Sequence, residues 1–270
     1  MMRITIVTSV LNGEKYIEDT LLSVLRQDYP DLEYIVQDGG STDGTIEIIK
    51  KYERELAFWE SRADNSMYEG IDAGFARSTG QIMGWLNADD ILFPHGLEKV
   101  SRLFGEFPAV DWVTGLRSVV DGSGEVLRSR MPIRYNKVNF LRGRTNIQQE
   151  STFWRRELWD KTGAMFPSQY RLAGDADLWA RFFSDANLYR VDECLGAFRR
   201  HGDQITQNQK VQYEQERDQI RRSHRRDIKW YWMKTFYDYV LSKTVRKADV
   251  YVPDITYNAE IGRFVLCKVG

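Results

Sequence analysis

The chain has 270 residues, and its 42% hydrophobic and 29% charged content is that of an ordinary globular protein with a substantial core. Its 38 basic and 39 acidic residues leave a net charge of −1, which gives no reason to expect nucleic acid as a partner. Two cysteines make neither a disulfide framework nor a zinc pattern, and no run of about 18 apolar residues could span a membrane, so we expect a cytoplasmic protein.

The amino-terminal part of the chain alternates between strand and helix patterns. The β-branched run Arg3–Val10 predicts a buried strand, which Asn12-Gly13 ends, and apolar residues then recur at helical spacing from Ile17 to Leu25. Further strands are predicted at Leu32–Asp38, Ala57–Ser61 and Gln81–Asn87, with helices after Thr45 and around Ile71. This order predicts an α/β fold with a mostly parallel sheet sandwiched by helices, in which ligands lie at the carboxyl ends of the strands.

The pattern changes after about residue 115. Asp121-Gly122 predicts a hairpin turn, and Ser151–Gly163 is typical of a strand or loop that leads into a helix. Asp175–Phe183 predicts a helix with one broad apolar face. Trp179 on that face has two interpretations, a core residue or a platform for a sugar ring. From about residue 207 the chain is polar and then basic and aromatic, which predicts a helical C-terminal extension.

Polar side chains stand at the predicted carboxyl ends of two strands. Asp38 ends the second strand, and Asn87, Asp89 and Asp90 end the fourth. A carboxylate only accepts hydrogen bonds, so Asp38 suits the donors of a nucleobase or ribose, although it would also serve as a cap for its own loop. The cluster after the fourth strand could hold Mg²⁺ or Mn²⁺ together with diphosphate oxygens, or it could form a solvated turn.

Several further segments occur in a specific order. Along the chain they are "VQDGGSTDGT", "DNSMYEGIDAG", "ARSTGQIMGWLNADD", "STFWRRELWDKTGAMF", "GDADLWARF" and "FRRHGDQIT". From about Ile4 to Thr206 this series resembles the inverting nucleotide-sugar glycosyltransferases of family 2, which have the GT-A fold. The resemblance implies transfer of a sugar, with inversion, from a nucleotide-sugar donor to an acceptor hydroxyl. The donor is expected to be UDP-linked and the acceptor to be a saccharide or a lipid-linked saccharide.

The resemblance also implies a role for each matching residue. Nucleotide-binding residues are expected at Thr8, Ser9, Asp38, Asp64 and Asn87. The divalent cation, Mn²⁺ or Mg²⁺, is expected at Asp89, Asp90 and His201. Asp175 stands where the family keeps its catalytic base. Two alternatives stay open: His201 as a loop histidine bonded to backbone, and Asp175 as the cap of its helix.

The sequence departs from the family pattern in places. Gln37 stands where the nucleobase motif often has a second Asp, and Asn87 replaces the first Asp of the metal motif. Asp72 and Ala73 stand where related sequences often carry Asn-Lys or Arg-Asn, which leaves the contacts to the donor sugar undefined. Gly174 replaces the Glu that often precedes the base, so the base is expected to act without a neighbouring carboxylate.

The chain is expected to have three parts. Residues 1–115 form the nucleotide-sugar-binding half, residues 116–206 form the acceptor-binding half of the same GT-A domain, and residues 207–270 form the helical C-terminal extension. Two other functions stay open. A non-catalytic nucleotide-sugar-binding subunit of a polysaccharide-assembly complex is disfavoured by the presence of Asp89 and Asp175. A nucleotidyltransferase is disfavoured because "TSVLNGEKY" offers one Gly and one Lys as a phosphate loop.

The stretch Arg217–Lys247 within the extension is basic and then aromatic. At helical spacing Tyr231 and Phe236 belong to one apolar stripe, and Trp230 and Met233 belong to a second, which is more than one helix needs for a single core contact. Basic side chains beside Trp and Tyr suit peripheral contact with the inner face of a membrane. Surplus aromatic residues equally mark protein interfaces such as a homo-oligomer contact, so both partners stay open.

Overall fold

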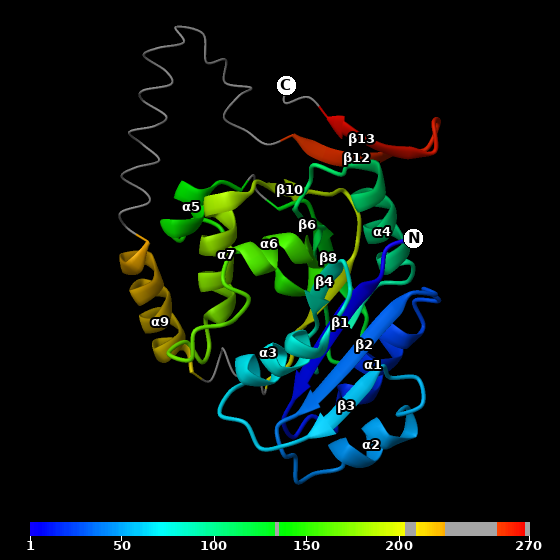
Figure 1. Ribbon diagram of the computed structural model, residues 1–270, viewed down its shortest axis with the longest axis vertical. Coiled ribbons are helices and arrows are strands. Elements are labelled where there is room, and N and C mark those ends of the chain that lie inside the picture. Colours follow the sequence, from blue (N-terminus) through cyan, green and yellow to red (C-terminus); the bar gives the residue numbers. More distant parts are fainter. Residues whose placement is uncertain (133–134, 203–208, 225–252, 268–270) are drawn as a thin grey trace, which may run out of the picture.

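A seven-stranded sheet forms the centre of the computed structural model, which describes residues 1–132, 135–202, 209–224 and 253–267 (Figure 1). The strands lie in the order β10-β6-β9-β4-β1-β2-β3. Their bounds are Ile4–Val10 for β1, Leu32–Asp38 for β2, Phe58–Ser61 for β3, Ile82–Trp85 for β4, Trp112–Thr114 for β6, Thr152–Arg155 for β9 and Leu188–Arg190 for β10. β9 runs antiparallel to β4 and β6, and the other neighbours are parallel. The prediction of a mostly parallel sheet is confirmed.

Helices cover both faces of this sheet, because successive side chains of a strand point to opposite sides. On β1, Ile6 packs into one hydrophobic cluster and Val7 into the other. The cluster around Ile6 takes in α1 (Ile17–Leu25), α2 (Thr45–Lys51) and α4 (Gly96–Glu106). The cluster around Val7 takes in α3 (Met67–Arg77), α5 (Lys137–Leu141), α6 (Arg156–Lys161) and α7 (Gly174–Asp185). Each large apolar side chain that is fully buried stabilises the fold by about 1.5–3 kcal/mol.

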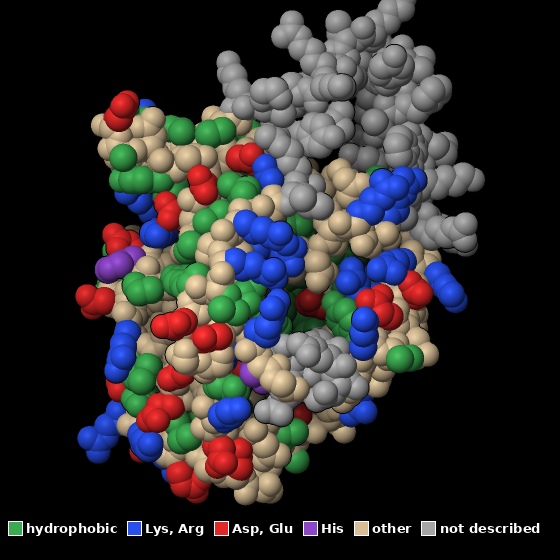
Figure 2. Space-filling model, turned by 180° about the vertical axis from the view of Figure 1, so that it is seen from behind, with side chains coloured by type: hydrophobic (Ala, Val, Ile, Leu, Met, Phe, Trp, Pro, Cys, Tyr) green, Lys and Arg blue, Asp and Glu red, His purple; other side chains and the backbone are tan. Residues whose placement is uncertain are grey.

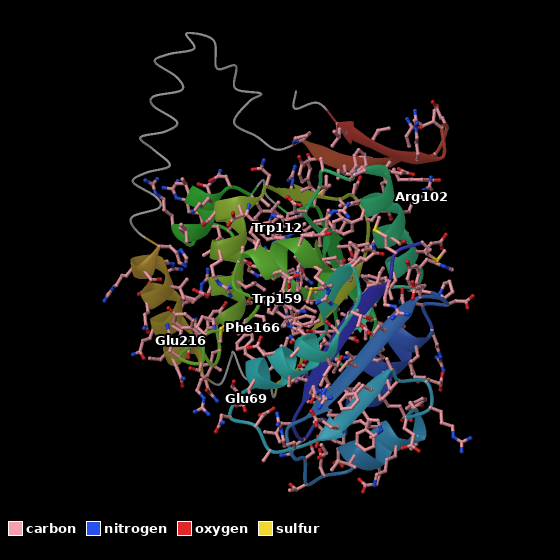
Figure 3. All side chains as sticks on the ribbon, viewed as in Figure 1. Glu69, Arg102, Trp112, Trp159, Phe166 and Glu216 are labelled. Atoms are coloured by element: carbon pink, nitrogen blue, oxygen red, sulfur yellow. The ribbon has the colours of Figure 1, made fainter. Side chains whose placement is uncertain are left out.

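Trp179 of α7 belongs to an aromatic layer between the helices and the sheet. Its ring stacks on Trp85 and Trp112 at centroid distances of 5.5 and 5.6 Å (Trp112 is labelled in Figure 3). Trp154 of β9 meets the same ring edge-on at 5.7 Å. Because 1% of Trp179 is exposed, it is a core residue and not a platform for a sugar.

A second sheet has four strands in the order β5-β11-β7-β8. Their bounds are Ile91–Leu92 for β5, Gly196–Arg199 for β11, Arg117–Val120 for β7 and Val126–Arg130 for β8. β7 and β8 form the predicted hairpin, whose turn is closed by Asp121 Oδ1 as it accepts the N–H groups of Ser123 and Glu125 at 2.8 and 3.0 Å. β8 is an edge strand and is exposed along its whole length.

The C-terminal extension is helical in its first part. Helix α9 (Lys210–Ser223) packs against α7, but an antiparallel hairpin of β12 (Asp254–Asn258) and β13 (Arg263–Cys267) follows beside α4 (Figure 1). The hairpin departs from the predicted helix because its apolar pattern has a period of two, with Ile255 and Phe264 buried and Gly262 at a φ of 63° in the turn. Residues 225–247 of the basic and aromatic stretch lie outside the described residues. In the described part of the chain, no helix is both long and apolar enough to cross a bilayer.

Candidate active site

The loops that follow β1 and β2 interlock at the carboxyl end of the sheet. Asn12 has a left-handed φ of 51°, accepts the N–H of Thr42 at 2.9 Å and donates its own N–H to Ser41 Oγ at 2.7 Å. The N–H of Gly13 donates to Thr45 Oγ1 at 2.8 Å. These bonds fix the loop that follows the second strand against the loop that follows the first.

Asp38 uses one of its two carboxylate oxygens within the protein. Oδ2 accepts the N–H groups of Gly40 and Ser41 at 3.1 and 3.0 Å and the hydroxyl of Ser61 at 2.6 Å. Oδ1 is buried and has no hydrogen-bond partner among the described residues. Because such an acceptor costs about 1–3 kcal/mol, this oxygen is suited to a donor from a ligand. Asp38 therefore caps its loop and still offers one acceptor.

Asp64 lies close to Asp38, and Ser9 lies on the other side of Asp64, because two glycines make room for these side chains. A Cβ atom on Gly39 would come within 3.1 Å of the Asp64 carboxylate, and one on Gly70 within 2.5 Å of Ser9 Oγ. Burial raises the pKa of Asp64, and nearby carboxylates, including that of Asp38, raise it further. A second acidic group thus stands beside the first at the end of β2.

The side chain of Thr8, which was expected in the base pocket, lies in the core. It is fully buried, and its hydroxyl lies 3.0 Å from the hydroxyl of Tyr34 on the neighbouring strand. Thr8 and Ser9 are adjacent on one strand, so they point to opposite faces of the sheet. The sequence located the correct strand end but could not assign both residues to one face.

Asp90 is fully buried and holds the turn after β4 from inside. Its Oδ2 accepts an N–H of Asn87 at 3.0 Å, and its Oδ1 accepts the backbone N–H of Arg199 at 2.8 Å. Burial raises the pKa of Asp90 well above its usual value, and the charges of Glu150 and Asp89 add to the shift. This environment does not favour the expected contact between Asp90 and a cation. The buried Oδ1 of Asn87 has no partner among the described residues and stays an acceptor for a ligand.

Asp89 and His201 come together from positions 112 residues apart. His201 Nε2 lies 2.8 Å from Asp89 Oδ2, and the ring of Tyr16 lies 4.6 Å from the imidazole. The Asp89 side chain is 32% exposed, unlike that of its neighbour Asp90. This contact favours the interpretation of His201 as a residue of the predicted cation site over that of a loop histidine bonded to backbone.

Arg199 organises the same corner, although the sequence did not single it out. Its side chain is buried; Nε donates to the carbonyl of Asp89 at 2.8 Å and Nη1 to the carbonyl of Gly122 at 3.0 Å. Nη2 pairs with Asp19 at 3.2 Å, and the guanidinium lies 5.0 Å from the centre of the Tyr16 ring. The available signal was the "FRRH" segment, but a buried Arg looks like a surface Arg until its partners are known.

Asp89 and His201 are the residues best placed for a divalent cation. Within the described ranges, no group of three or more His, Cys, Asp or Glu side chains is arranged to hold a metal ion. A cation at this pair would therefore need further oxygens, which a diphosphate supplies in many Mg²⁺ sites. The pair fits the predicted cation on that condition.

Glu150 is a further buried acid near Asp89, and the sequence did not predict its place there. It lies in the 3-10 turn η1 (Gln149–Ser151), and its buried Oε1 has no partner among the described residues. Burial raises the pKa of Glu150 to about 7; the charge of Asp89 adds to the shift and that of Arg117 opposes it. Its place directly before "STFWRRELW" was the one available signal.

Asp175 is the second residue of α7 and faces Tyr68 of α3. Its Oδ1 accepts the N–H of Ala176 at 2.8 Å and the hydroxyl of Tyr68 at 3.4 Å, and that hydroxyl oxygen accepts the N–H of Asp175 at 3.1 Å. Burial raises the pKa of Asp175, and the charge of Arg217 opposes the shift. The N-cap of α7 is Ala173, so Asp175 does not cap the helix as the alternative required.

Helix α9 supplies a carboxylate to the turn that leads into α7. Glu216 Oε2 accepts the N–H of Leu172 at 2.8 Å and that of Ala173 at 2.9 Å (Glu216 is labelled in Figure 3). A Cβ atom on Gly174 would lie 2.8 Å from the Tyr68 ring, so the packing leaves no room for a Glu there. The position before Asp175 lacks a carboxylate, but another helix brings one to the same turn.

A cavity of about 520 Å³ lies beside Tyr68, between the start of α3 and the loop before α7. Phe166 and Asp72 are among the residues that line it (Phe166 is labelled in Figure 3). Asp72 accepts the N–H of Phe166 with its two oxygens at 3.1 and 2.9 Å, and burial raises its pKa to about 7. Asp72 therefore anchors the loop before α7.

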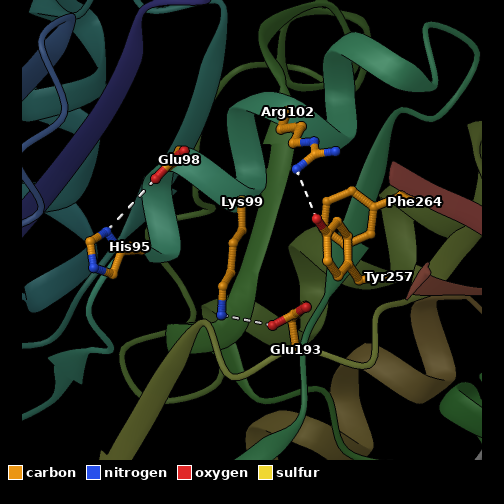
Figure 4. Close-up of a pocket in the computed structure, with 7 residues that line it drawn as sticks. All are labelled: His95, Glu98, Lys99, Arg102, Glu193, Tyr257 and Phe264. Carbon is orange, nitrogen blue, oxygen red and sulfur yellow. Dashed lines mark hydrogen bonds and ion pairs between the residues drawn. The ribbon is translucent and has the colours of Figure 1, made fainter. Parts of the chain in front are cut away.

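A second cavity, of about 220 Å³, lies between α4 and the C-terminal hairpin (Figure 4). The basic side chains of this cavity have partners within it. Lys99 bonds Glu193 at 2.7 Å, and Arg102 lies over the ring of Tyr257 at 5.0 Å. Because these side chains already have partners, the cavity offers little to a ligand. The contacts between Arg102 and Tyr257 attach the hairpin to α4.

Comparison with known proteins concerns the family and the fold of the chain. The family model described as glycosyl transferase family 2 matches residues 5–164. An uncharacterized glycosyltransferase of Nostoc sp. is 24% identical over 213 residues, which cover 74% of this chain and 66% of that protein.

Solved structures with the same fold include two complexes with nucleotide sugars. The first is S. aureus TarS 1–349 with UDP-GlcNAc (TM-score 0.65, 17% identity, 76% of this chain and 61% of that one). The second is the mannosyltransferase PcManGT from Pyrobaculum calidifontis with GDP-Man and Mn²⁺ (TM-score 0.57, 18% identity, 73% and 56%). The chain thus spans about three fifths of the length of these structures. At this identity the likeness shows the fold, which is the predicted GT-A type.

Proposed function

Since the chain belongs to glycosyl transferase family 2, we propose that it is a nucleotide-sugar glycosyltransferase, which transfers a sugar from a UDP-linked donor to an acceptor hydroxyl with inversion. The acceptor is a saccharide or a lipid-linked saccharide. Residues 1–115 bind the donor, and residues 116–206 bind the acceptor. The observation that carries this proposal is the buried, unpartnered Oδ1 of Asp38, an acceptor at the strand end where a nucleobase binds in such folds.

The donor is held at the ends of β1, β2 and β4. Asp38 Oδ1 accepts the imide N–H of uracil, with Ser9 and Asp64 beside it, and Asn87 Oδ1 accepts from the ribose. Asp89 and His201 hold the divalent cation, and Asp90 keeps the turn in place from inside. When bound, the cation offsets the negative charge that grows on the departing diphosphate.

Asp175 acts as the general base on the acceptor. Tyr68 and Ala176 hold its Oδ1, and Oδ2 takes the proton of the attacking hydroxyl on the face of the sugar opposite the diphosphate. A pKa raised by burial makes this carboxylate a better base than an exposed one. The anomeric carbon then passes through an oxocarbenium-like state, as in glycoside hydrolysis.

A thermal-shift panel tests the donor half of the proposal. UDP, GDP and dTDP sugars are added to the intact chain with Mn²⁺, because a ligand that binds the folded state raises the melting temperature. We expect UDP sugars to give the largest shift, and Asp38→Ala to abolish it while Glu47→Ala, an exposed acid on α2, keeps it. A larger shift with GDP sugars would contradict the uracil assignment, and no shift with any nucleotide would contradict the function.

A further inference from the structure

Basic side chains surround a hollow on one face of the molecule. Figure 2 shows Lys and Arg gathered around this hollow, with an acidic side chain in its floor. By their places in Figure 1, the basic groups lie over the β7–β8 hairpin on one side and over α5 and α9 on the other. The chain as a whole has a net charge of −1, so composition alone does not produce such a concentration.

The hairpin places three arginines on one face of the second sheet. Arg117 of β7 pairs in register with Arg130 of β8, and Val119 pairs with Arg128. Residues that face each other across an antiparallel pair, and residues two apart along a strand, share a face. Arg117, Arg128 and Arg130 therefore point the same way. We call these three residues the basic rim.

No ion pair neutralises the basic rim. Among the described residues, no carboxylate forms an ion pair with Arg117, Arg128 or Arg130, whereas other arginines such as Arg181 are paired. Charges on an edge strand can serve to prevent aggregation. That explanation suits β8 but not Arg117, which lies on the inner strand β7.

The basic rim lies close to the donor part of the proposed catalytic centre. Gln148, just before η1, donates from Nε2 to the carbonyl of Ser118, the neighbour of Arg117, at 2.6 Å. The charges of Arg117 and Asp89 both act on the carboxyl of Glu150 in η1. On the other side, α9 carries Arg217, whose charge acts on Asp175. A molecule that extends from the rim across the hollow toward α9 would approach the proposed base, while the donor stays at the ends of β1, β2 and β4.

We propose that the basic rim binds an anionic acceptor, a glycan or polyol chain that carries phosphate or carboxylate groups. This inference rests on the proposed function, since it names the class of acceptor for the same centre. Guanidinium groups donate two parallel hydrogen bonds to such anions, so arginine is the side chain expected here. The unpaired arginines are spaced along a strand and suit charges that repeat along a chain.

Binding measurements on the intact chain test this inference without requiring turnover. The probes are polyphosphate, polygalacturonate and neutral dextran, with Arg128→Gln/Arg130→Gln as the variant. The control is Lys50→Gln/Arg54→Gln, which removes two exposed charges in and after α2. We expect at least one of the two anionic probes to bind the parent chain and the control variant with equal affinity. The same probe should bind the rim variant about 10-fold more weakly. Rising salt should weaken that binding, and dextran should not bind.

Several outcomes would overturn the inference. Equal affinity of both variants for the anions, or no anion binding by the parent chain, would remove the anionic acceptor. An equal loss of UDP binding with Mn²⁺ in the rim variant would assign the rim to the donor diphosphate. Binding to phosphatidylglycerol vesicles without binding to either soluble polyanion would make the rim a membrane surface. Rim-dependent anion binding without any nucleotide binding would contradict the proposed function and leave the rim as a polyanion site.

Discussion

Asp89 and Asp90 are adjacent in the sequence but lie in different environments, and this difference separates their effects. Asp89 is partly exposed beside His201, whereas Asp90 is buried and bonded to Asn87 and to the backbone of Arg199. At the scale of the residue, burial and partners therefore decide which acid can meet a ligand and which supports the fold.

The first prediction contrasts these two acids. Asp89→Asn should keep the melting temperature of the nucleotide-free protein and lose the Mn²⁺-dependent stabilisation by UDP. Asp90→Ala should lower stability by about 1–3 kcal/mol even without ligand, because the buried N–H of Arg199 and the partly buried amide of Asn87 lose their acceptor. Thermal melts with and without Mn²⁺ and UDP distinguish them. Unchanged Mn²⁺-dependent stabilisation in the Asp89 variant would contradict its role at the cation.

The second prediction concerns Asp175, the proposed base. Asp175→Asn is nearly isosteric and should retain UDP binding while turnover falls by on the order of 10²-fold or more. The rate of the parent enzyme should rise with pH through the pKa of Asp175, which burial places above its usual value, because the base acts when it is deprotonated. Release of nucleoside diphosphate measures both effects. A fully active variant would remove Asp175 from the mechanism.

The third prediction concerns the buried acid Asp72. Its pKa is about 7 in the folded protein and about 4 in the unfolded chain, so folding favours the protonated form. The stability that protonated Asp72 contributes is fully present below about pH 4 and is lost as the pH rises through about 7. Asp72→Asn removes the titration. The free energy of unfolding of the variant, relative to that of the parent protein, should therefore rise by on the order of 1–2 kcal/mol from about pH 5 to pH 8, after allowance for partial exposure. Melts of both proteins across that range measure the difference, and a constant difference would contradict the pKa shift.

Elements of this fold were predictable where the signal was local. β2 was expected and found at Leu32–Asp38, and the helix expected from Ile17 became α1, because their periodic apolar patterns match the geometry of each element. The roles of Glu150, Arg199 and Glu216 could not be predicted, since each depends on partners from distant segments. The resemblance to family 2 identified the fold, but only the packing shows that Asp90 is buried and that Thr8 belongs to the core.

The fourth prediction belongs to α9 and tests how one element supports another. Glu216 is buried and accepts two backbone N–H groups at the start of α7, so Glu216→Gln should lower the free energy of unfolding by about 1–3 kcal/mol. Glu214→Gln, an exposed change on the same helix, is the control and should have little effect. Chemical denaturation compares them. Equal stability of the two variants would show that α9 does not hold the turn before the base.

At the scale of the whole molecule, the C-terminal hairpin joins the far edge of the central sheet. Val191, just after β10, forms a parallel bridge with Ile255 of β12, and the N–H of Asp192 donates to the carbonyl of Ile255 at 3.1 Å. An uncovered sheet edge exposes unpaired backbone groups, so this contact protects the end of the sheet opposite β3. The last segment that the structure describes is thus attached to the core of the α/β domain.

The final prediction tests that attachment. Arg190 of β10 makes two bonds to the Asp254 carboxylate, at 2.7 and 2.5 Å, and its side chain is 10% exposed. Asp254→Ala leaves the guanidinium buried without this counter-charge and should destabilise the protein by about 3 kcal/mol. Arg190→Met/Asp254→Ala also removes the buried guanidinium. The double variant should recover part of that loss of stability, because burial costs an apolar side chain less than it costs an unpaired cation. Urea denaturation of the three proteins measures the coupling. If the single and the double variant are destabilised equally, the ion pair does not hold the hairpin in place. The apolar packing of Ile255 and Phe264 would then attach the hairpin to the domain.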